Sequence, residues 1–98
     1  MDAQRLRNLT TMRLHTEMAH IYDDIEVITG SQGVMTHQLG MACRALKPYL
    51  EAQQLDPRFW DGKYDTAHVG EVQVRPMNDS EREEYFQRFK AQPNPLFS

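Results

Sequence analysis

The sequence predicts a mainly α-helical protein, a small three-helix domain with a long irregular segment between the second and third helices. Two apolar stripes at helical spacing predict the first two helices, and a capping motif predicts the third. The chain has 98 residues, the size of one domain, so residues 1–98 are expected to form a single unit. Hydrophobic residues make up 40% of it and charged residues 26%, which indicates a globular rather than a disordered chain.

Residues 1–13 are polar and lean basic. Their weak helical pattern of apolar residues consists of Leu6, Leu9 and Met12. This pattern is out of phase with the one that follows, so a helix here either frays or turns a different face to a different neighbour. The segment also holds three arginines, namely Arg5, Arg7 and Arg13. We expect these arginines to be solvated at a helix start, and contact with a phosphate backbone is the alternative.

The first helix is predicted over residues 14–29. Its apolar stripe recurs at intervals of four and three residues and consists of Leu14, Met18, Ile21, Ile25 and Ile28. Gly30 ends the helix, because glycine readily takes the left-handed conformation that closes one. A short strand over residues 25–29 is the alternative, since most of these residues are β-branched. If other helices cover the stripe only in part, a symmetric homodimer through it would bury the rest. A monomer with a covered stripe is the other arrangement.

The second helix is predicted over residues 36–53, with Thr36 as its N-cap. Its apolar stripe consists of Leu39, Cys43, Leu46 and Leu50. Pro48 predicts either a kink near residues 44–48 or a break followed by a new turn. Because the link between the two helices is short, we expect them to be antiparallel neighbours whose stripes face each other.

Residues 54–78 show turn signals and little helical periodicity. The aromatic residues of this segment are Phe59, Trp60 and Tyr64. Val72 and Val74 are typical of a short strand, although a single strand has no obvious partner. Irregular segments of this length are often functional, and the alternative is that the aromatic residues fasten the segment to the helices.

The third helix is predicted over residues 79–91. Ser80 and Glu83 form a capping box at its start, and acidic residues favour that end of the helix dipole. Its buried face consists of Tyr85, Phe86 and Phe89. Pro93 and Pro95 stop the helix, and residues 92–98 are expected to be a mobile tail.

No residue pattern predicts a catalytic, cofactor or metal site, so we expect a protein that is not an enzyme and needs no cofactor. His15 and His20 are five positions apart and lie ~140° apart around a helix, so they do not share one face for a metal. Cys43 is the chain's one cysteine and falls on an apolar stripe. It predicts a buried structural thiol rather than a nucleophile, in a reducing, cytoplasmic setting.

Two further classes of function are disfavoured by composition. The net charge of −3 argues against direct nucleic-acid binding, because such binding depends on a basic surface. The alternative function is that of a small nucleic-acid-associated regulator that uses the N-terminal arginines. No apolar run approaches the ~18 residues of a membrane span, and no segment has the pattern of a signal peptide. We therefore expect neither membrane insertion nor export.

Three stretches of the chain resemble small uncharacterised proteins encoded in bacteriophage and prophage genomes. They are ITGSQGVMTHQ at residues 28–38, DPRFWDG at residues 56–62 and FQRFK at residues 86–90. The resemblance implies a phage accessory protein in the cytoplasm of a bacterial host. Small acidic phage proteins often block a host defence complex, such as a CRISPR effector or a restriction enzyme. This association suggests a host bacterial protein as the partner, and no residue role follows from it.

The segment from Asp56 to His68 is the predicted partner surface, because interfaces favour Trp, Tyr and Arg at their centres. Its predicted contact residues are Arg58, Trp60, Asp61, Tyr64 and Asp65. Acidic residues outnumber basic ones here, which would suit a basic groove on the partner. The second candidate is the acidic face of the first helix, formed by Asp23, Asp24 and Glu26. Carboxylates adjacent on a helix more often form a solvated face. The competing interpretation of the aromatic residues, favoured for Phe59 and Trp60 but not for Tyr64, is that they are core residues.

Overall fold

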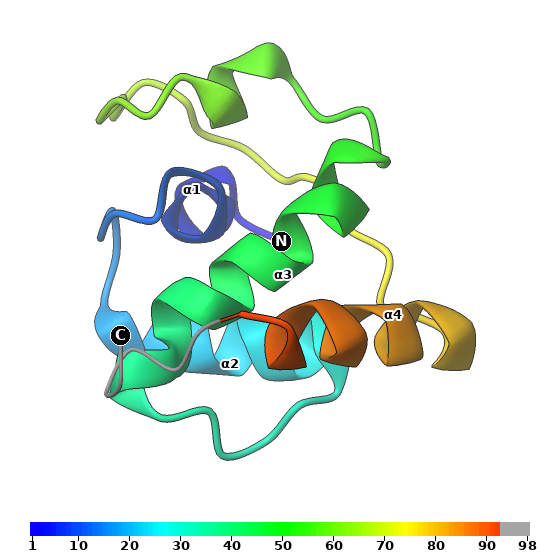
Figure 1. Cartoon of the computed structure of the whole chain (residues 1–98). Coiled ribbons are helices and arrows are strands. Elements are labelled where there is room, and N and C mark those ends of the chain that lie inside the picture. Colours follow the sequence, from blue (N-terminus) through cyan, green and yellow to red (C-terminus); the bar gives the residue numbers. More distant parts are fainter. Residues whose placement is uncertain (93–98) are drawn as a thin grey trace.

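The computed structural model describes residues 1–92, and Figure 1 shows the arrangement of their helices. The α-helices of this range are α1 (Ala3–Thr11), α2 (Met18–Thr29), α3 (Leu39–Glu51) and α4 (Asp79–Lys90). Two short 3-10 helices, η1 (Thr36–Gln38) and η2 (Pro57–Trp60), accompany them. The mainly α-helical prediction is confirmed, but residues 1–92 hold four α-helices rather than three. All four contribute to one apolar cluster.

The additional helix is α1, so the expectation of a solvated helix start is wrong. Asp2 caps it by accepting a hydrogen bond from the Arg5 backbone N–H at 3.2 Å. Its apolar residues Leu6 and Leu9 are buried, and so are the polar side chains next to them. The helix packs against α2, α3 and η2, so it is covered on several sides. The alternative, in which this stretch turns its own face to its own neighbours, is confirmed.

The helix α2 begins at Met18 rather than at Leu14. Met12 takes a left-handed conformation (φ 59°) and ends α1, and residues 12–17 form a link. The buried Asn8 side chain fixes this link, because its oxygen accepts from the His15 N–H at 2.7 Å. At the other end Gly30 closes α2 as predicted, with φ 71° and a bond to the Glu26 carbonyl. Residues 25–29 are helical, so the alternative of a strand there is wrong.

The link from α2 to α3 reverses the predicted orientation of these two helices. Figure 1 shows both helices beginning on the left, with residues 30–38 returning along the length of α2. The hydroxyls of Tyr22 and Thr36 meet at 2.8 Å, which places η1 beside the first half of α2. A helix of 12 residues is about 18 Å long, and the extended residues 30–35 span up to about 20 Å. The antiparallel prediction is wrong because this link is long enough to carry the chain back.

The helix α3 runs without a break from Leu39 to Glu51, with Pro48 in its last turn. The predicted break at Pro48 is therefore wrong, and the helix also ends two residues before the predicted Gln53. Its apolar side lies in the core, with Ala42, Leu46 and Leu50 almost fully buried. α3 packs chiefly against α4.

The helix α4 is capped by Asn78, two residues before the predicted Ser80. The Asn78 side chain accepts from the Glu81 N–H at 2.8 Å, and the Glu81 carboxylate accepts from the Asn78 N–H at 2.9 Å. Tyr85 is fully buried, and the predicted partners Phe86 and Phe89 are partly buried against the core. Residues 93–98, which include both predicted stop prolines, lie outside the described residues. The described Gln92, by contrast, is fixed by a bond to the Met41 carbonyl at 2.8 Å.

The segment between α3 and α4 is irregular apart from η2, as predicted, and it passes over α1 (Figure 1). Phe59 anchors it in the core. The predicted strand at residues 72–74 does not form within the described chain. Instead the Val72 N–H donates to the Met1 carbonyl at 2.7 Å, and the Ala3 N–H donates to the Gly70 carbonyl at 2.8 Å. One isolated bridge, between Asp2 and Glu71, results from this pairing.

Candidate protein-interaction surface

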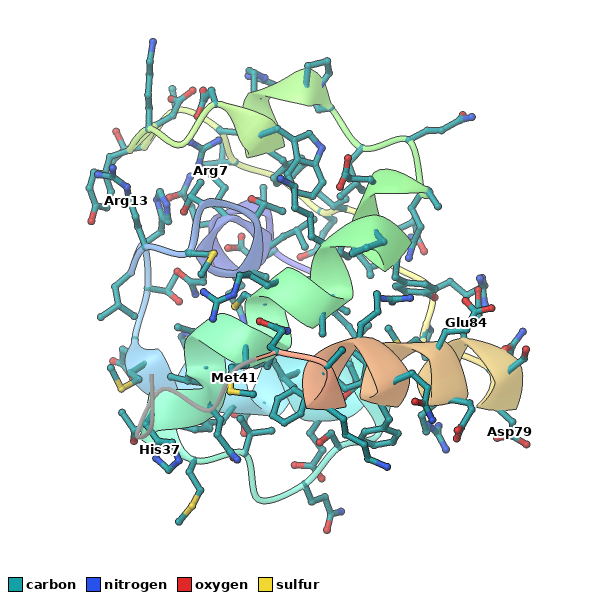
Figure 2. The ribbon with its side chains drawn as sticks, viewed as in Figure 1. Arg7, Arg13, His37, Met41, Asp79 and Glu84 are labelled. Carbon is teal, nitrogen blue, oxygen red and sulfur yellow. The ribbon has the colours of Figure 1, made fainter. Side chains whose placement is uncertain are left out.

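Arg7 of α1 holds the predicted partner segment in place. Its side chain is fully buried, and Figure 2 shows it between α1 and the segment that passes above. The guanidinium donates to the backbone carbonyls of Arg58, at 2.9 Å, and of Lys63. It also donates to Asp61 Oδ1 at 3.2 Å and to His68 Nδ1 at 2.9 Å. One side chain thus fixes the path of residues 58–68.

The three aromatic residues of this segment have different environments. Phe59 is a core residue, and its ring centre lies 4.3 Å from that of His68. Trp60 is partly buried, with the Lys47 ammonium 6.0 Å from its ring centre. Tyr64 is 62% exposed. Among the predicted aromatic contacts, Tyr64 is therefore the most available to a partner.

The acidic residues of the segment are largely engaged within the protein. Asp56 pairs with Arg58 at 2.8 Å, and hydrogen bonds from the Arg58 side chain and backbone lower the pKa of Asp56 to about 2. Asp61 accepts from the Lys63 N–H and from Arg7, which lowers its pKa. Asp65 caps a turn by accepting from the Ala67 N–H. Local partners thus offset part of the negative charge counted from the sequence.

The second predicted surface, the acidic face of α2, is only partly exposed. Asp24 is buried and accepts two hydrogen bonds from Arg5, at 3.0 and 2.7 Å, so its place in a contact surface was wrongly predicted. Asp23 and Glu26 are exposed. The same ion pair bears on the arginines of residues 1–13. With Arg5 paired and Arg7 buried, Arg13 is the one of the three that remains open to a phosphate.

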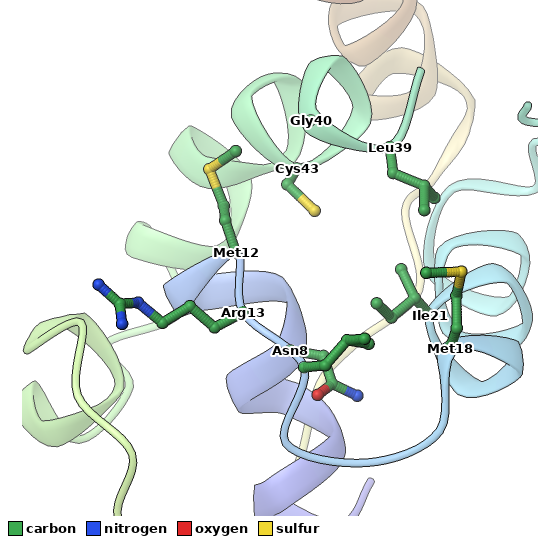
Figure 3. Close-up of a pocket in the computed structure, with 9 residues that line it drawn as sticks. Asn8, Met12, Arg13, Met18, Ile21, Leu39, Gly40 and Cys43 are labelled. Carbon is green, nitrogen blue, oxygen red and sulfur yellow. The ribbon is translucent and has the colours of Figure 1, made fainter. Parts of the chain in front are cut away.

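A groove that the sequence did not reveal opens where α1, α2 and α3 meet. Figure 3 shows side chains from the three helices around one space. The volume of this space is about 170 Å³. We call it the apolar groove, and its apolar lining consists of Met12, Leu14, Met18, Ile21, Leu39 and Cys43. Met12, Leu14 and Met18 are exposed by 48%, 47% and 43% at its rim. These values make the groove an apolar surface that faces solvent rather than an internal cavity.

The groove arises from the link between α1 and α2. Leu14 and Met18 belong to the predicted apolar stripe, whose other members Ile21, Ile25 and Ile28 are buried. Because α1 stops at Met12, Leu14 leaves the helical line and stays at the surface with Met18. Sequence reasoning placed Leu14 within a helix and so missed the groove. The sequence signal that could have revealed the groove is the presence of apolar residues on both sides of the link between α1 and α2.

Tyr64 lies close to this groove. The Arg13 guanidinium, which extends from the groove wall, lies 5.7 Å from the centre of the Tyr64 ring. The His15 ring, on the same link, is 4.8 Å from it. Tyr64 therefore lies next to the link between α1 and α2, which supplies part of the groove wall, so the predicted segment is a neighbour of a site that was not predicted.

Cys43 lies on the groove wall, facing the space between the helices (Figure 3). It is buried and unpaired, and burial raises the pKa of its thiol to about 11. The prediction of a buried cysteine is confirmed. Within residues 1–92 no three side chains of His, Cys, Asp or Glu are grouped as metal ligands. None of the helices in that range has the length and apolar character to cross a bilayer.

Comparison with known proteins gives one match. The model of the family described as a domain of unknown function (DUF7736) matches residues 1–61, more than half of the chain. The matched range includes α1, α2, α3 and η2, and with them every residue that lines the apolar groove. No curated protein and no solved structure matches.

Proposed function

The chain belongs to the DUF7736 family, whose function is unknown, and we propose that it is a non-enzymatic protein that binds and inhibits a host protein. The observation that carries this proposal is the apolar groove with its exposed rim. Single exposed apolar side chains are common on protein surfaces, but a cluster around a depression marks an interaction site. Two of the three rim residues are methionines, whose flexible side chains suit adaptable binding surfaces.

The neighbouring aromatic segment supports the same surface. Tyr64 is exposed beside Arg13, and tyrosine and arginine are enriched at the centres of interfaces. We propose that Tyr64 and the groove rim form the contact centre, with Arg58, Trp60, Asp61 and Asp65 around it. Arg7 holds this segment in one shape, which lowers the entropy lost on binding.

The proposed target is a bacterial defence complex, such as a CRISPR effector or a restriction enzyme. This part of the proposal rests on the resemblance of residues 28–38, 56–62 and 86–90 to phage-encoded proteins. On this proposal the protein acts in the cytoplasm of an infected bacterium. A protein that blocks such a complex needs a binding surface rather than a catalytic centre, and the apolar groove supplies a candidate for one.

Two substitutions on the same helix test the binding surface. Met18→Glu places a charge at the groove rim, and Val27→Glu places one at a 63% exposed position of α2 outside the groove. Each variant is used to capture proteins from a bacterial host. We expect Met18→Glu to weaken partner binding by about 30-fold, as for a contact worth about 2 kcal/mol. We expect Val27→Glu to bind like the unmodified protein.

Melting temperatures accompany the capture, so that loss of binding is separated from loss of fold. Tyr64→Ala tests the aromatic half of the surface, and we expect it to reduce capture with little change in melting temperature, because Tyr64 is exposed. A partner retained in equal amount by Met18→Glu and Tyr64→Ala would refute this surface. If Val27→Glu alone lost the partner, the interface would instead lie on the exposed side of α2.

A further inference from the structure

Two arginines beside the apolar groove have no carboxylate partner among the described residues. Within residues 1–92, five arginines pair with carboxylates, namely Arg5, Arg7, Arg58, Arg75 and Arg82. In the same range no carboxylate lies within 4.0 Å of Arg13, Arg44 or Arg88. Arg88 donates to the Ala45 carbonyl at 2.7 Å, whereas Arg13 and Arg44 adjoin the groove. The described chain thus leaves positive charge beside an apolar surface, although the net charge of the protein is −3.

Arg44 lies beside Gly40, and Gly40 lines the groove. A Cβ atom placed on Gly40 would lie 3.3 Å from Arg44 Nη1 and 3.7 Å from Met12 Cε, so both side chains adjoin this wall. Arg44 Nε donates to Gln92 Oε1 at 2.7 Å, which orients the guanidinium and leaves its charge unpaired. Arg13 likewise has a neutral neighbour, the Tyr64 ring. Two oriented cations therefore lie beside the groove. Arg44 of α3 is next to its Gly40 wall, and Arg13 follows α1, with its guanidinium extending outward from the groove toward Tyr64 (Figure 3).

The size of the groove limits what enters it. Ligand pockets for small molecules usually have about 300–1,000 Å³. The apolar groove, with about 170 Å³, has room for one large side chain. A peptide segment presents such a side chain together with charged neighbours, and planar guanidinium groups pair well with carboxylates.

We infer that the apolar groove takes an acidic protein segment, in which one large apolar side chain enters the groove and nearby carboxylates pair with Arg13 and Arg44. This inference rests on the proposed function and names the chemistry of the partner. It differs from the sequence expectation of a basic partner groove, because Asp56 and Asp61 of the predicted segment already have internal cationic partners. Glu17 is exposed next to Met18 and gives the α2 end of the groove the opposite charge. The carboxylates of the bound partner segment are therefore expected on the side of α1 and α3.

Selection from a library of displayed random peptides of about 12 residues, three turns of helix, tests this inference. The unmodified protein is expected to enrich peptides that carry Leu, Phe, Met or Trp with Asp or Glu within about one turn. A synthetic enriched peptide then serves as the probe. We expect Arg13→Glu and Arg44→Glu each to weaken its binding about fivefold or more, and salt to weaken its binding to the unmodified protein. Lys90→Glu, an exposed charge reversal on α4, is the matched control and should change little.

The inference is overturned if enriched peptides have basic or uncharged flanks, if no peptide is enriched, or if the probe binds Arg13→Glu and Arg44→Glu as well as the unmodified protein. It is also overturned if the groove proves to hold another occupant. Concentration-dependent dimers abolished by Met18→Glu would identify a second copy of the chain. Peptide binding seen only in the double variant Leu96→Ser with Phe97→Ser would identify the chain's own terminal residues as the occupant of the groove.

This outcome is separate from that of the proposed function. If the groove selects basic peptides while Met18→Glu still abolishes capture of the host partner, the charge inference fails and the proposed function stands. If the groove selects acidic peptides while capture of the host partner is independent of Met18, the inference stands and the proposed inhibition through this surface fails.

Discussion

Arg7 carries its positive charge wholly inside the protein. A buried charge is costly unless acceptors surround it, and Arg7 meets two backbone carbonyls, a carboxylate and an imidazole nitrogen. A guanidinium only donates, so Nδ1 of His68 accepts. The planar guanidinium of arginine has several N–H donors and reaches groups at several points along one loop. The ammonium of lysine is a single compact charge and does not reach all of them. Arg7 thereby ties η2 and the residues after it to α1.

Replacing Arg7 tests this role. We expect Arg7→Met to lower the free energy of unfolding by about 3 kcal/mol, because it removes the side-chain donor of two part-buried carbonyls and one of the two donors to Asp61. Urea unfolding measures the change. Arg13→Met is the control, since Arg13 is exposed, and it should stay within about 0.5 kcal/mol of the unmodified protein. Equal stability of the two variants would show that Arg7 does not organise the segment.

Cys43 gives a second prediction for a single residue. Burial raises the pKa of its thiol to about 11, so native labelling should be slow and should accelerate with pH up to that value. In the unfolded chain the thiol ionises near its ordinary pKa of 9.0. The contribution of the buried, protonated thiol to the stability of the fold is therefore fully present below pH 9 and is lost as the pH rises from 9 to about 11. Rapid labelling of the native protein at neutral pH would contradict burial. Cys43→Ala should cost about 1–2 kcal/mol in lost packing.

Helix boundaries depend on side chains that compete to cap them. At the start of α4 the sequence offers Asn78, Ser80 and two glutamates that suit the N3 position of a cap. The structure uses Asn78 with Glu81, and Arg75 also pairs with Glu81. Hydrogen bonds from the Arg75 side chain and the Asn78 backbone lower the pKa of Glu81 to about 2. This additional partner favours the Asn78 cap over the one at Ser80.

Two alanine variants distinguish the caps. Asn78→Ala should destabilise the protein by about 1 kcal/mol, because it removes the acceptor of an otherwise unpaired helix N–H. Ser80→Ala should stay within about 0.5 kcal/mol, since Ser80 lies inside the helix and is exposed. Thermal unfolding of both variants at neutral pH measures the difference. A larger loss in Ser80→Ala would restore the cap predicted from the sequence.

The arrangement of the whole molecule follows from the two links around α2. The first link takes Leu14 out of the helical line, and the second returns the chain so that α3 starts beside the start of α2. Together they bring Met12, Met18 and Leu39 to one place and form the apolar groove. They also bury Ile21, Ile25 and Ile28, so three of the five residues predicted for a homodimer are inside the monomer. A dimer through the complete stripe is not available in this fold.

We therefore expect a monomer in solution. A stable interface buries about 1,200 Å² or more, and the half-exposed Leu14 and Met18 supply only a small part of that area. Light scattering at micromolar concentration should give a mass near 11.5 kDa. If it gave twice that mass instead, Met18→Glu would show whether the groove forms the dimer contact.

The sequence by itself determined the helical class, a helix within residues 14–29, the irregular aromatic segment and the buried Cys43. These features depend on local periodicity and turn residues, which act over a few positions. Only the tertiary structure decided that α1 is a full helix around a buried Arg7, that Asp24 is paired, and that α3 begins beside α2. The apolar groove depends on where α1 ends and on where α3 begins. Its residues come from three helices and a link, and no local pattern brings residues 12, 18 and 39 together, because the path of the chain between them is set by packing.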